Sequence, residues 1–409
     1  MRDLRLDRRH VLSQLASLGG LAAGSRILGL DPFSLSNSSV CAAESNSSPE
    51  LASYPQKTDL ILLTDRPPQL ETPLQYFQTD LTPNDAFFVR WHLSGIPTSI
   101  DSKAFRLEVS GNVNKPLSLS LRDLRAKFHP VSVVALCQCA GNGRSLFEPR
   151  VPGGQWGNGA MSNARWRGVR LKDVLEAAGV RAGSVQVGFH GLDVAPLPQM
   201  PRFEKSLSID RARESDVLIA YEMNGAPLPM LNGFPLRLVV PGWYATYWVK
   251  SLSAISVLDK PLKTFWMDTA YRIPNNPGAE ESPQHLAAET VPISRMSVHS
   301  IFVKPAPNEQ LRVAQSYTLE GVANDGGSGI RKVEISVDDG KTWSDATLGD
   351  DLGPYSWRRW RAPWTPPTAG SYRILVRATA NNGQQQAASQ WNRSGYQRDT
   401  IEHVGVTAA

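Results

Sequence analysis

The sequence predicts an α+β domain that is followed by an all-β domain. Candidate strands such as FRLEVSG and LRLVVPG alternate with short helical patterns up to about residue 260. From about residue 300 only strand patterns with alternating apolar residues remain. Several such strands in about 110 residues are typical of an immunoglobulin-like sandwich. The 30 prolines and 32 glycines favour many short elements, so we expect no coiled coil or helical repeat.

The first residues carry an export pattern. Arg8 and Arg9 stand directly before an uncharged, moderately apolar stretch from Val11 to Ser25. Twin arginines in this position favour a bacterial twin-arginine signal, which exports folded proteins, over an amphipathic helix. The stretch is shorter than the roughly 20 apolar residues that a membrane span needs. We therefore predict a signal peptide over residues 1–43, a periplasmic location and no membrane span.

The rest of the chain divides by composition. Residues 37–58 are rich in serine, asparagine and proline and have no period, which predicts a linker there. Proline and asparagine also interrupt every pattern between the two domains, which predicts a long ordered loop there. We expect the linker at 44–59, the α+β domain at 60–270, the crossover loop at 271–300 and the sandwich at 301–409.

Individual elements can be placed within these domains. One helix is expected to open at Ser120, with Asp123 completing a capping box. The string LKDVLEAAGV predicts a second helix that ends near Gly179. In the all-β domain, IRKVEISVDDGKTW predicts a hairpin turn at DDGK after a strand with one apolar face, formed by Val333, Ile335 and Val337. The string YRILVRATANNGQ repeats this design with Tyr372, Ile374 and Val376.

Charge and cysteine content narrow the classes of function. The formal net charge of +5 comes from 43 basic and 38 acidic residues without a dense basic stripe, so we expect no nucleic-acid partner. Cys41 falls within the predicted signal, which leaves Cys137 and Cys139. In an extended strand their Cα atoms lie about 6.5–7 Å apart, the outer limit for a disulfide. A thiol kept at a strand end without a disulfide partner indicates a chemical role for a sulfur.

The common catalytic spacings are missing from the sequence. It contains no His-Glu-x-x-His, no Cys-x-x-Cys-His for covalent haem, no P-loop and no Gly-x-Ser-x-Gly. What remains is a set of short strings that join a glycine or proline turn to a cation, a histidine or an aromatic residue: NDAFFVRWHLSGIP, CAGNGR, GFHGLDVAP, NGFPLRLVVPGWYATYWVK and TAYRIPNNP. Each string by itself more often has a structural role.

In this order, however, the strings resemble the sulfite oxidase family of molybdenum enzymes, in particular the molybdopterin subunit of bacterial periplasmic sulfite dehydrogenases. The resemblance covers nearly the whole chain after the predicted signal. YSWRRW and WNRSGY are similar to strings of the family's dimerisation domain. The resemblance implies a sulfite-oxidase-type molybdopterin-binding catalytic domain at 60–270 and a dimerisation role for the immunoglobulin-like sandwich.

CAGNGR is the most specific string, and it implies the metal ligand. The family pattern places Cys139, not Cys137, on molybdenum. Cys137 lies inside the apolar run, so we expect it in the core. A soft thiolate suits a molybdenum centre that also carries dithiolene sulfurs. The other positions that the resemblance assigns to the molybdenum-molybdopterin cofactor are Phe88, Val89, Arg90, His92, Asp193, Arg237, Trp248, Val249 and Lys250. Asn232 stands where vertebrate members have a histidine, so its contact is left open.

The resemblance also implies oxidation of sulfite to sulfate. Sulfite is a small anion, and binding it needs several preorganised donors. Arg90 and Arg144 resemble the family's anion-binding arginines, Tyr271 falls on its active-site tyrosine and Trp156 on a pocket tryptophan. His92 could hydrogen-bond to Tyr271 or gate the release of product.

Two departures from the vertebrate pattern concern electrons and substrate. Vertebrate members carry an N-terminal haem domain, for which we expect no room before residue 60, and no haem motif occurs elsewhere. We therefore expect no haem in this chain and a c-type cytochrome as the electron acceptor, either as a soluble protein or as a haem subunit. The chain is expected to form a homodimer through its sandwich or a heterodimer with that subunit. Arg393 is shifted by one position from the vertebrate arginine, so a third anion-binding arginine is left open.

Two other functions stay open. A sulfane dehydrogenase of the thiosulfate-oxidising multienzyme system would share the fold and cofactor but act on a protein-bound sulfur chain. A non-catalytic periplasmic binding protein could instead use the sandwich as its functional part. Molybdenum content separates the second from an enzyme, because an enzyme of this family needs about one molybdenum per chain.

Overall fold

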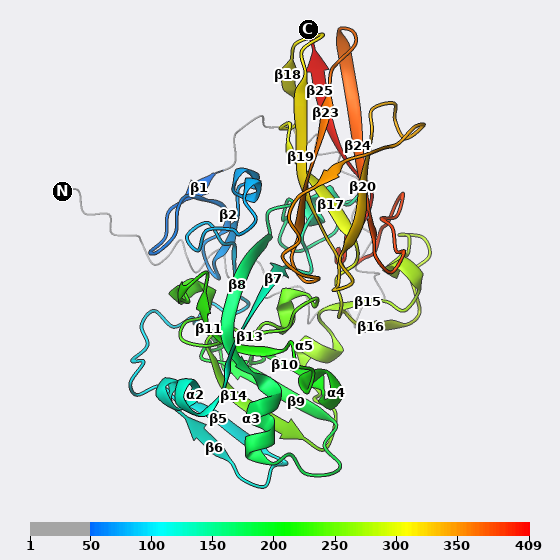
Figure 1. Cartoon of the computed structure of the whole chain (residues 1–409). Coiled ribbons are helices and arrows are strands. Elements are labelled where there is room, and N and C mark those ends of the chain that lie inside the picture. The colour runs from blue at the N-terminus through cyan, green and yellow to red at the C-terminus, as the bar shows by residue number, and fades with distance from the viewer. Residues whose placement is uncertain (1–49) are drawn as a thin grey trace, which may run out of the picture. The chain divides into compact units, whose positions relative to one another are not determined.

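The structure is a computed structural model that describes residues 50–409. The predicted signal peptide and Cys41 lie outside the described residues. Within the described range, no helix is long and apolar enough to cross a membrane. The chain is rich in strands, and its helices are short (Figure 1).

Three sheets build the α+β part. The first joins β1 (Leu51–Ala52), β2 (Leu60–Thr64), β3 (Gln69–Glu71) and β4 (Val89–Arg90) in chain order. The second has the order β10-β9-β14-β5-β6, with β10 (Glu204–Ser208), β9 (Gln186–Gly191), β14 (Leu252–Leu258), β5 (Leu107–Gly111) and β6 (Leu117–Leu119). The third has the order β12-β11-β8-β7, with β12 (Ala226–Pro227), β11 (Leu218–Met223), β8 (Met161–Arg170) and β7 (Pro130–Gln138). A further strand, β13 (Arg237–Val239), also pairs with β11.

Short helices connect these strands. Helix α2 (Leu121–Lys127) has the predicted capping box, in which Ser120 and Asp123 exchange side-chain and backbone hydrogen bonds. Helix α3 (Leu171–Ala178) ends as predicted at Gly179, whose positive φ of 67° suits a residue without a Cβ atom. Two further helices are single turns, α4 (Ile209–Ala212) and α5 (Phe265–Asp268). The buried faces of α2 and α3 join one large apolar core with strands of the second and third sheets.

Two sheets form the C-terminal part. One has the order β17-β19-β23-β22, with β17 (His299–Lys304), β19 (Tyr317–Asn324), β23 (Arg358–Trp364) and β22 (Thr347–Leu348). The other has the order β18-β25-β24-β20-β21, with β18 (Glu309–Leu311), β25 (Glu402–Ala408), β24 (Gly370–Ala380), β20 (Ile330–Ser336) and β21 (Ser344–Asp345) (Figure 1). Leu319 and Trp360 from one sheet and Ile374 and Val376 from the other share one core, so the sheets pack face to face.

The DDGK turn follows β20 as predicted. Asp339 and Gly340 both take positive φ, 58° and 87°, before the chain returns along β21. The predicted apolar face is one residue too long, because Val337 lies beyond the end of β20 and is 36% exposed. The strand stops there because the hydroxyl of Ser336 accepts a hydrogen bond from the Gly340 amide, which starts the turn.

Two stretches that looked irregular in sequence contain ordered elements. The segment at 271–300 includes the antiparallel pair β15 (Arg272–Pro274) and β16 (Thr290–Pro292), and β17 begins before its end. The segment at 44–59 contributes β1 and the buried residue Lys57. The order of the described chain therefore begins before Leu60.

Candidate active site

A pocket in the α+β part collects many of the predicted site residues. It has about 390 Å³ of empty space, part of it open to solvent, and its lining includes Phe88, Arg90, His92, Cys139, Arg237, Lys250 and Tyr271. Arg90 lies in β4 and Arg237 in β13, the other five lie in the segments between strands, and the seven span more than 180 positions of the chain. Only the folded chain brings them together.

The CAGNGR turn presents a thiol to this pocket. Strand β7 ends at Gln138, and the next residue, Cys139, is 7% exposed and lines the cavity. Its amide donates to the carbonyl of Ala160 at 2.9 Å, and its carbonyl accepts from the amide of Asn142 at 3.1 Å. Gly143, with φ of 75°, lets the chain turn back. The Cys139 thiol is therefore held at a strand-to-turn junction, where the sequence predicted it.

Cys137 is fully buried in the main core, as predicted. It also has a polar contact that the sequence did not predict, because Nη2 of Arg237 donates to its sulfur at 3.2 Å. Burial raises the pKa of the Cys137 thiol, and the positive charge of Arg237 opposes that shift. Cys137 is thus a core residue that also supports a cation of the pocket.

The pocket is cationic. Arg90, Arg237 and Lys250 line it, and none of the lining residues of the described chain is acidic. Buried Nη1 of Arg90 and Nε of Arg237 have no hydrogen-bond partner within residues 50–409. Burial, and next the charge of Arg237, lower the pKa of Lys250 to about 7. Buried donors without acceptors are costly, so this arrangement fits an anionic group that supplies several oxygens.

These features fit a molybdopterin with its phosphate. In the described residues, no three His, Cys, Asp or Glu side chains gather as a metal site. A metal at Cys139 would therefore depend on ligands from the cofactor itself, which a dithiolene provides. Thr246 adds a third buried polar atom without a partner, Oγ1, to the same lining.

Tyr271 and His92 meet at one side of the pocket. The Tyr271 hydroxyl oxygen lies 2.6 Å from Nε2 of His92. Burial lowers the pKa of His92, and the charges of Arg90, Lys250 and Lys205 lower it further. The imidazole is therefore neutral, and in the tautomer with its proton on Nδ1 its Nε2 accepts the hydrogen bond from the Tyr271 hydroxyl. Burial raises the pKa of the Tyr271 phenol. The predicted contact between the two residues is present.

Arg144 does not line the pocket. Its guanidinium donates to the carbonyls of Gly395 at 3.1 Å, Gly154 at 3.2 Å and Ser394 at 3.2 Å. It also lies 4.8 Å from the ring centroid of Tyr396, which stacks on Tyr271 at 5.2 Å. In this structure Arg144 therefore supports the wall behind Tyr271, rather than presenting free donors to an anion.

Several other predicted residues lie behind the lining. Trp156 is 1% exposed in the main core, and Val89 packs in a smaller cluster with Trp91. Trp248 lies under the guanidinium of Arg237, 5.8 Å from ring centroid to Cζ, and Val249 accepts a backbone hydrogen bond from Leu238. Asp193 is buried, and desolvation raises the pKa of its carboxyl while the charge of Lys250 opposes the shift. The structure does not bring these five side chains to the cavity surface.

Asn232, which replaces the vertebrate histidine, does line the pocket. Its Oδ1 accepts from the ammonium of Lys57, its Nδ2 donates to the Phe88 carbonyl at 3.1 Å, and its own carbonyl accepts from Arg237 at 3.1 Å. Lys57 also donates to the carbonyls of Asn84 and Phe87. No local pattern in the sequence points to Lys57, because its partners are distant in the chain.

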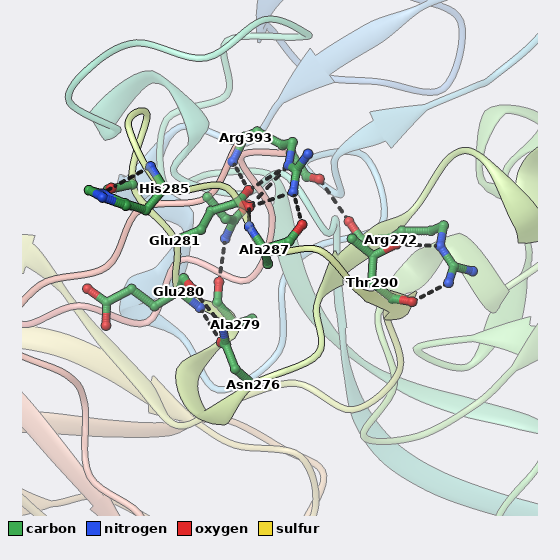
Figure 2. Close-up of polar contacts among 12 residues, drawn as sticks. Arg272, Asn276, Ala279, Glu280, Glu281, His285, Ala287, Thr290 and Arg393 are labelled. Carbon is green, nitrogen blue, oxygen red and sulfur yellow. Dashed lines mark hydrogen bonds and ion pairs between the residues drawn. The ribbon is translucent and has the colours of Figure 1, made fainter.

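Arg393 does not line the pocket, and its guanidinium pairs with Glu281 instead (Figure 2). Its Nη2 lies 2.8 Å from Oε2 of Glu281, its Nε lies 3.0 Å from Oε1, and its amide donates to the same carboxylate. Burial alone would raise the pKa of Glu281, but the hydrogen bonds from Arg393 outweigh burial and lower it. Arg393 therefore fixes the loop before β16 and is no third arginine of the pocket.

Comparisons with known proteins give two matching domain families. Residues 93–266 match the oxidoreductase molybdopterin binding domain, and residues 290–404 match the Mo-co oxidoreductase dimerisation domain.

Whole-chain similarity extends to named sulfite oxidases. The chain is 33% identical to sulfite oxidase of Gallus gallus over 348 residues, which are 82% of this chain and 74% of that protein. It is 34% identical to mitochondrial sulfite oxidase of Mus musculus over 357 residues, 83% of this chain. It spans 63% of the length of the mouse protein. The sulfane dehydrogenase SoxCD of Paracoccus pantotrophus has a similar fold, with a TM-score of 0.73, 23% identity and coverage of 92% of this chain and 95% of that chain.

Proposed function

The chain belongs to the sulfite oxidase family of molybdenum enzymes, and on that basis we propose that it oxidises sulfite to sulfate at a molybdenum-molybdopterin centre. The net reaction converts sulfite and water into sulfate, two protons and two electrons. The bound cofactor would supply the two-electron redox chemistry at sulfur. The protein's own residues would hold the cofactor, bind the anion and move the protons.

One observation carries the proposal. A single thiol, Cys139, shares a pocket with buried guanidinium nitrogens of Arg90 and Arg237 that have no partner in the described chain. We assign Cys139 as the metal ligand because it is the thiol that lines the cavity. Arg237 and Lys250 would hold the pterin phosphate, and Arg90 would hold the sulfite oxygens.

Tyr271 and His92 would manage the protons. The Tyr271 hydroxyl would donate a hydrogen bond to the neutral imidazole of His92, with 2.6 Å between the hydroxyl oxygen and Nε2. The pair can therefore take up a proton from the pocket and pass it on. Each turnover releases two protons, and within the pocket lining His92 is the base that contacts Tyr271.

We also propose a periplasmic location and a c-type cytochrome as the electron acceptor. The twin arginines Arg8 and Arg9 support export, and the resemblance to bacterial sulfite dehydrogenases supports the cytochrome. We propose further that the C-terminal sheets form an immunoglobulin-like sandwich through which two chains dimerise. The match of residues 290–404 to a dimerisation domain supports this dimer.

The test is steady-state oxidation of sulfite by the purified protein with ferricytochrome c as acceptor, alongside metal analysis. We expect about one molybdenum per chain and saturable turnover. Full molybdenum occupancy without sulfite turnover would overturn the assignment of substrate and direct the next assay to a protein-bound sulfur chain. A protein without molybdenum would overturn the assignment as an enzyme.

A further inference from the structure

Lys205 is a buried lysine that the proposed chemistry does not use, and burial lowers its pKa to about 7. It lies in β10, its side chain is fully buried, and Nζ donates to the carbonyl of Trp266 at 2.7 Å. Within residues 50–409 no carboxylate forms an ion pair with it. Its neighbour Glu204 pairs with Arg202 at 2.8 Å instead. A lysine in this state is unusual, because a buried ammonium is costly without an anionic partner.

Two aromatic rings surround the ammonium. Nζ of Lys205 lies 4.6 Å from the ring centroid of Tyr247 and 5.2 Å from that of Tyr271. The Tyr247 hydroxyl donates to the carbonyl of Ile293 at 2.6 Å, which fixes that ring. Both distances are within the range of a cation–π contact, which is strongest when water is excluded. Lys205 is therefore held by Trp266 and Tyr247 and faces Tyr271.

Tyr271 needs such support. Its φ is 60°, a left-handed conformation that is uncommon for a bulky residue. Tyr396 stacks on its ring at 5.2 Å with an interplanar angle of 7°, and its hydroxyl must reach His92. The ring is thus oriented by a stacked aromatic and by the cation of Lys205.

We propose that Lys205 is a positioning residue for the Tyr271–His92 pair, in which its cation–π contact orients the Tyr271 ring so that the hydroxyl meets His92. Only the expected effect on kcat rests on the proposed function, and the contact between Lys205 and Tyr271 does not. Nζ of Lys205 lies 5.2 Å from the ring centroid of Tyr271, and Lys205 does not line the pocket, so it acts through the orientation of that ring. The lowered pKa of His92, caused by burial and then by Arg90, Lys250 and Lys205, agrees with a hydrogen bond in which His92 is the acceptor.

The experiment separates charge from hydrogen bonding. Lys205→Gln keeps a donor for the Trp266 carbonyl but removes the charge, and Lys205→Arg restores the charge. The matched control is Lys260→Met, at an exposed lysine. We measure kcat and KM for sulfite. We also measure the chemical shift of ¹³Cζ in tyrosine-labelled holoprotein, where the Tyr271 signal is the one that Tyr271→Phe removes.

We expect Lys205→Gln to lower kcat about tenfold with KM within about twofold, because an effect on the transition state alone leaves ground-state binding intact. The Tyr271 resonance should shift in Lys205→Gln, Lys205→Arg should recover most of both readouts, and Lys260→Met should change neither. An unchanged resonance and kcat in Lys205→Gln would overturn the proposal.

The two proposals can fail separately. If the wild-type protein does not oxidise sulfite, the proposed function fails, while the Tyr271 resonance still tests the contact. If Lys205→Gln does not fold, the resonance in Lys205→Met decides, because that variant also removes the charge. A Tyr271 shift in Lys205→Met that is displaced by more than the control variant's supports the contact, and an unmoved one contradicts it.

Discussion

Nη2 of Arg237 lies 3.2 Å from the sulfur of Cys137, two residues before the thiol that lines the pocket. The end of β7 and the turn that follows it therefore contribute two residues to the site. Cys139 faces the cavity, and Cys137 supports a cation that also faces it. The two cysteines have different roles, and their substitutions should have different effects.

Cys139→Ser should abolish sulfite turnover, with a loss of more than about 100-fold in kcat, because an alkoxide or hydroxyl is a poor substitute for a soft thiolate on molybdenum. Cys137→Ser is the matched control and should keep most activity, because a serine hydroxyl can accept the hydrogen bond from Arg237. The measurement is kcat per bound molybdenum. An equal loss in both variants would contradict Cys139 as the ligand.

Tyr271→Phe removes the hydroxyl that His92 accepts from. We expect kcat to fall about 100-fold, the order of a lost acid–base group, while molybdenum content stays at the wild-type level. Tyr372→Phe, in the C-terminal sheets, is the control and should keep kcat. A wild-type kcat for Tyr271→Phe would rule out proton transfer through its hydroxyl.

Arg393→Met should destabilise the protein without weakening substrate binding. It leaves the carboxylate of Glu281, whose side chain is 1% exposed, without its cation, and we expect a loss of about 2 kcal/mol in the free energy of unfolding. Urea denaturation measures the loss, and KM for sulfite should stay within about twofold. A tenfold rise in KM with unchanged stability would instead place Arg393 at the substrate.

Lys57 should make stability depend on pH. Burial lowers its pKa from 10.5 to about 7 in the folded protein, so between pH 7 and 10.5 the unfolded chain binds more protons than the folded chain. The free energy of unfolding should therefore rise with pH across this window through Lys57. Urea denaturation at pH 7 and pH 9 should show a smaller rise in Lys57→Met than in the wild type. An equal rise in both would contradict the lowered pKa.

The C-terminal part should hold two chains together. Size exclusion with light scattering should give twice the mass of one chain, as the match to a dimerisation domain indicates. A single-chain mass at micromolar concentration would contradict the homodimer.

Local patterns predicted the local elements well. The capping box of α2, the end of α3 at Gly179 and the turn after β20 each depend on residues close together in sequence. The resemblance also identified most of the pocket lining, including Cys139 and Tyr271. The sheet pairings were not predicted, because they depend on long-range register.

What the sequence could not predict depends on distant partners. Two donors of Arg144 bind carbonyls about 250 positions away, and Lys57 donates to Asn232 across 175 positions. No local pattern contains such information. Lys205 was missed for the same reason, since a lysine on a strand normally faces solvent and only its packed aromatic neighbours show that it is buried.

The contact of Arg144 with Ser394 and Gly395 also sets an order of events during synthesis. The turn that carries Cys139 is synthesised about 250 residues before the carbonyls that hold its arginine, and before Tyr396, which stacks on Tyr271. The wall of the pocket behind Tyr271 is therefore incomplete until residues 394–396 have been made, long after the thiol that the pocket presents.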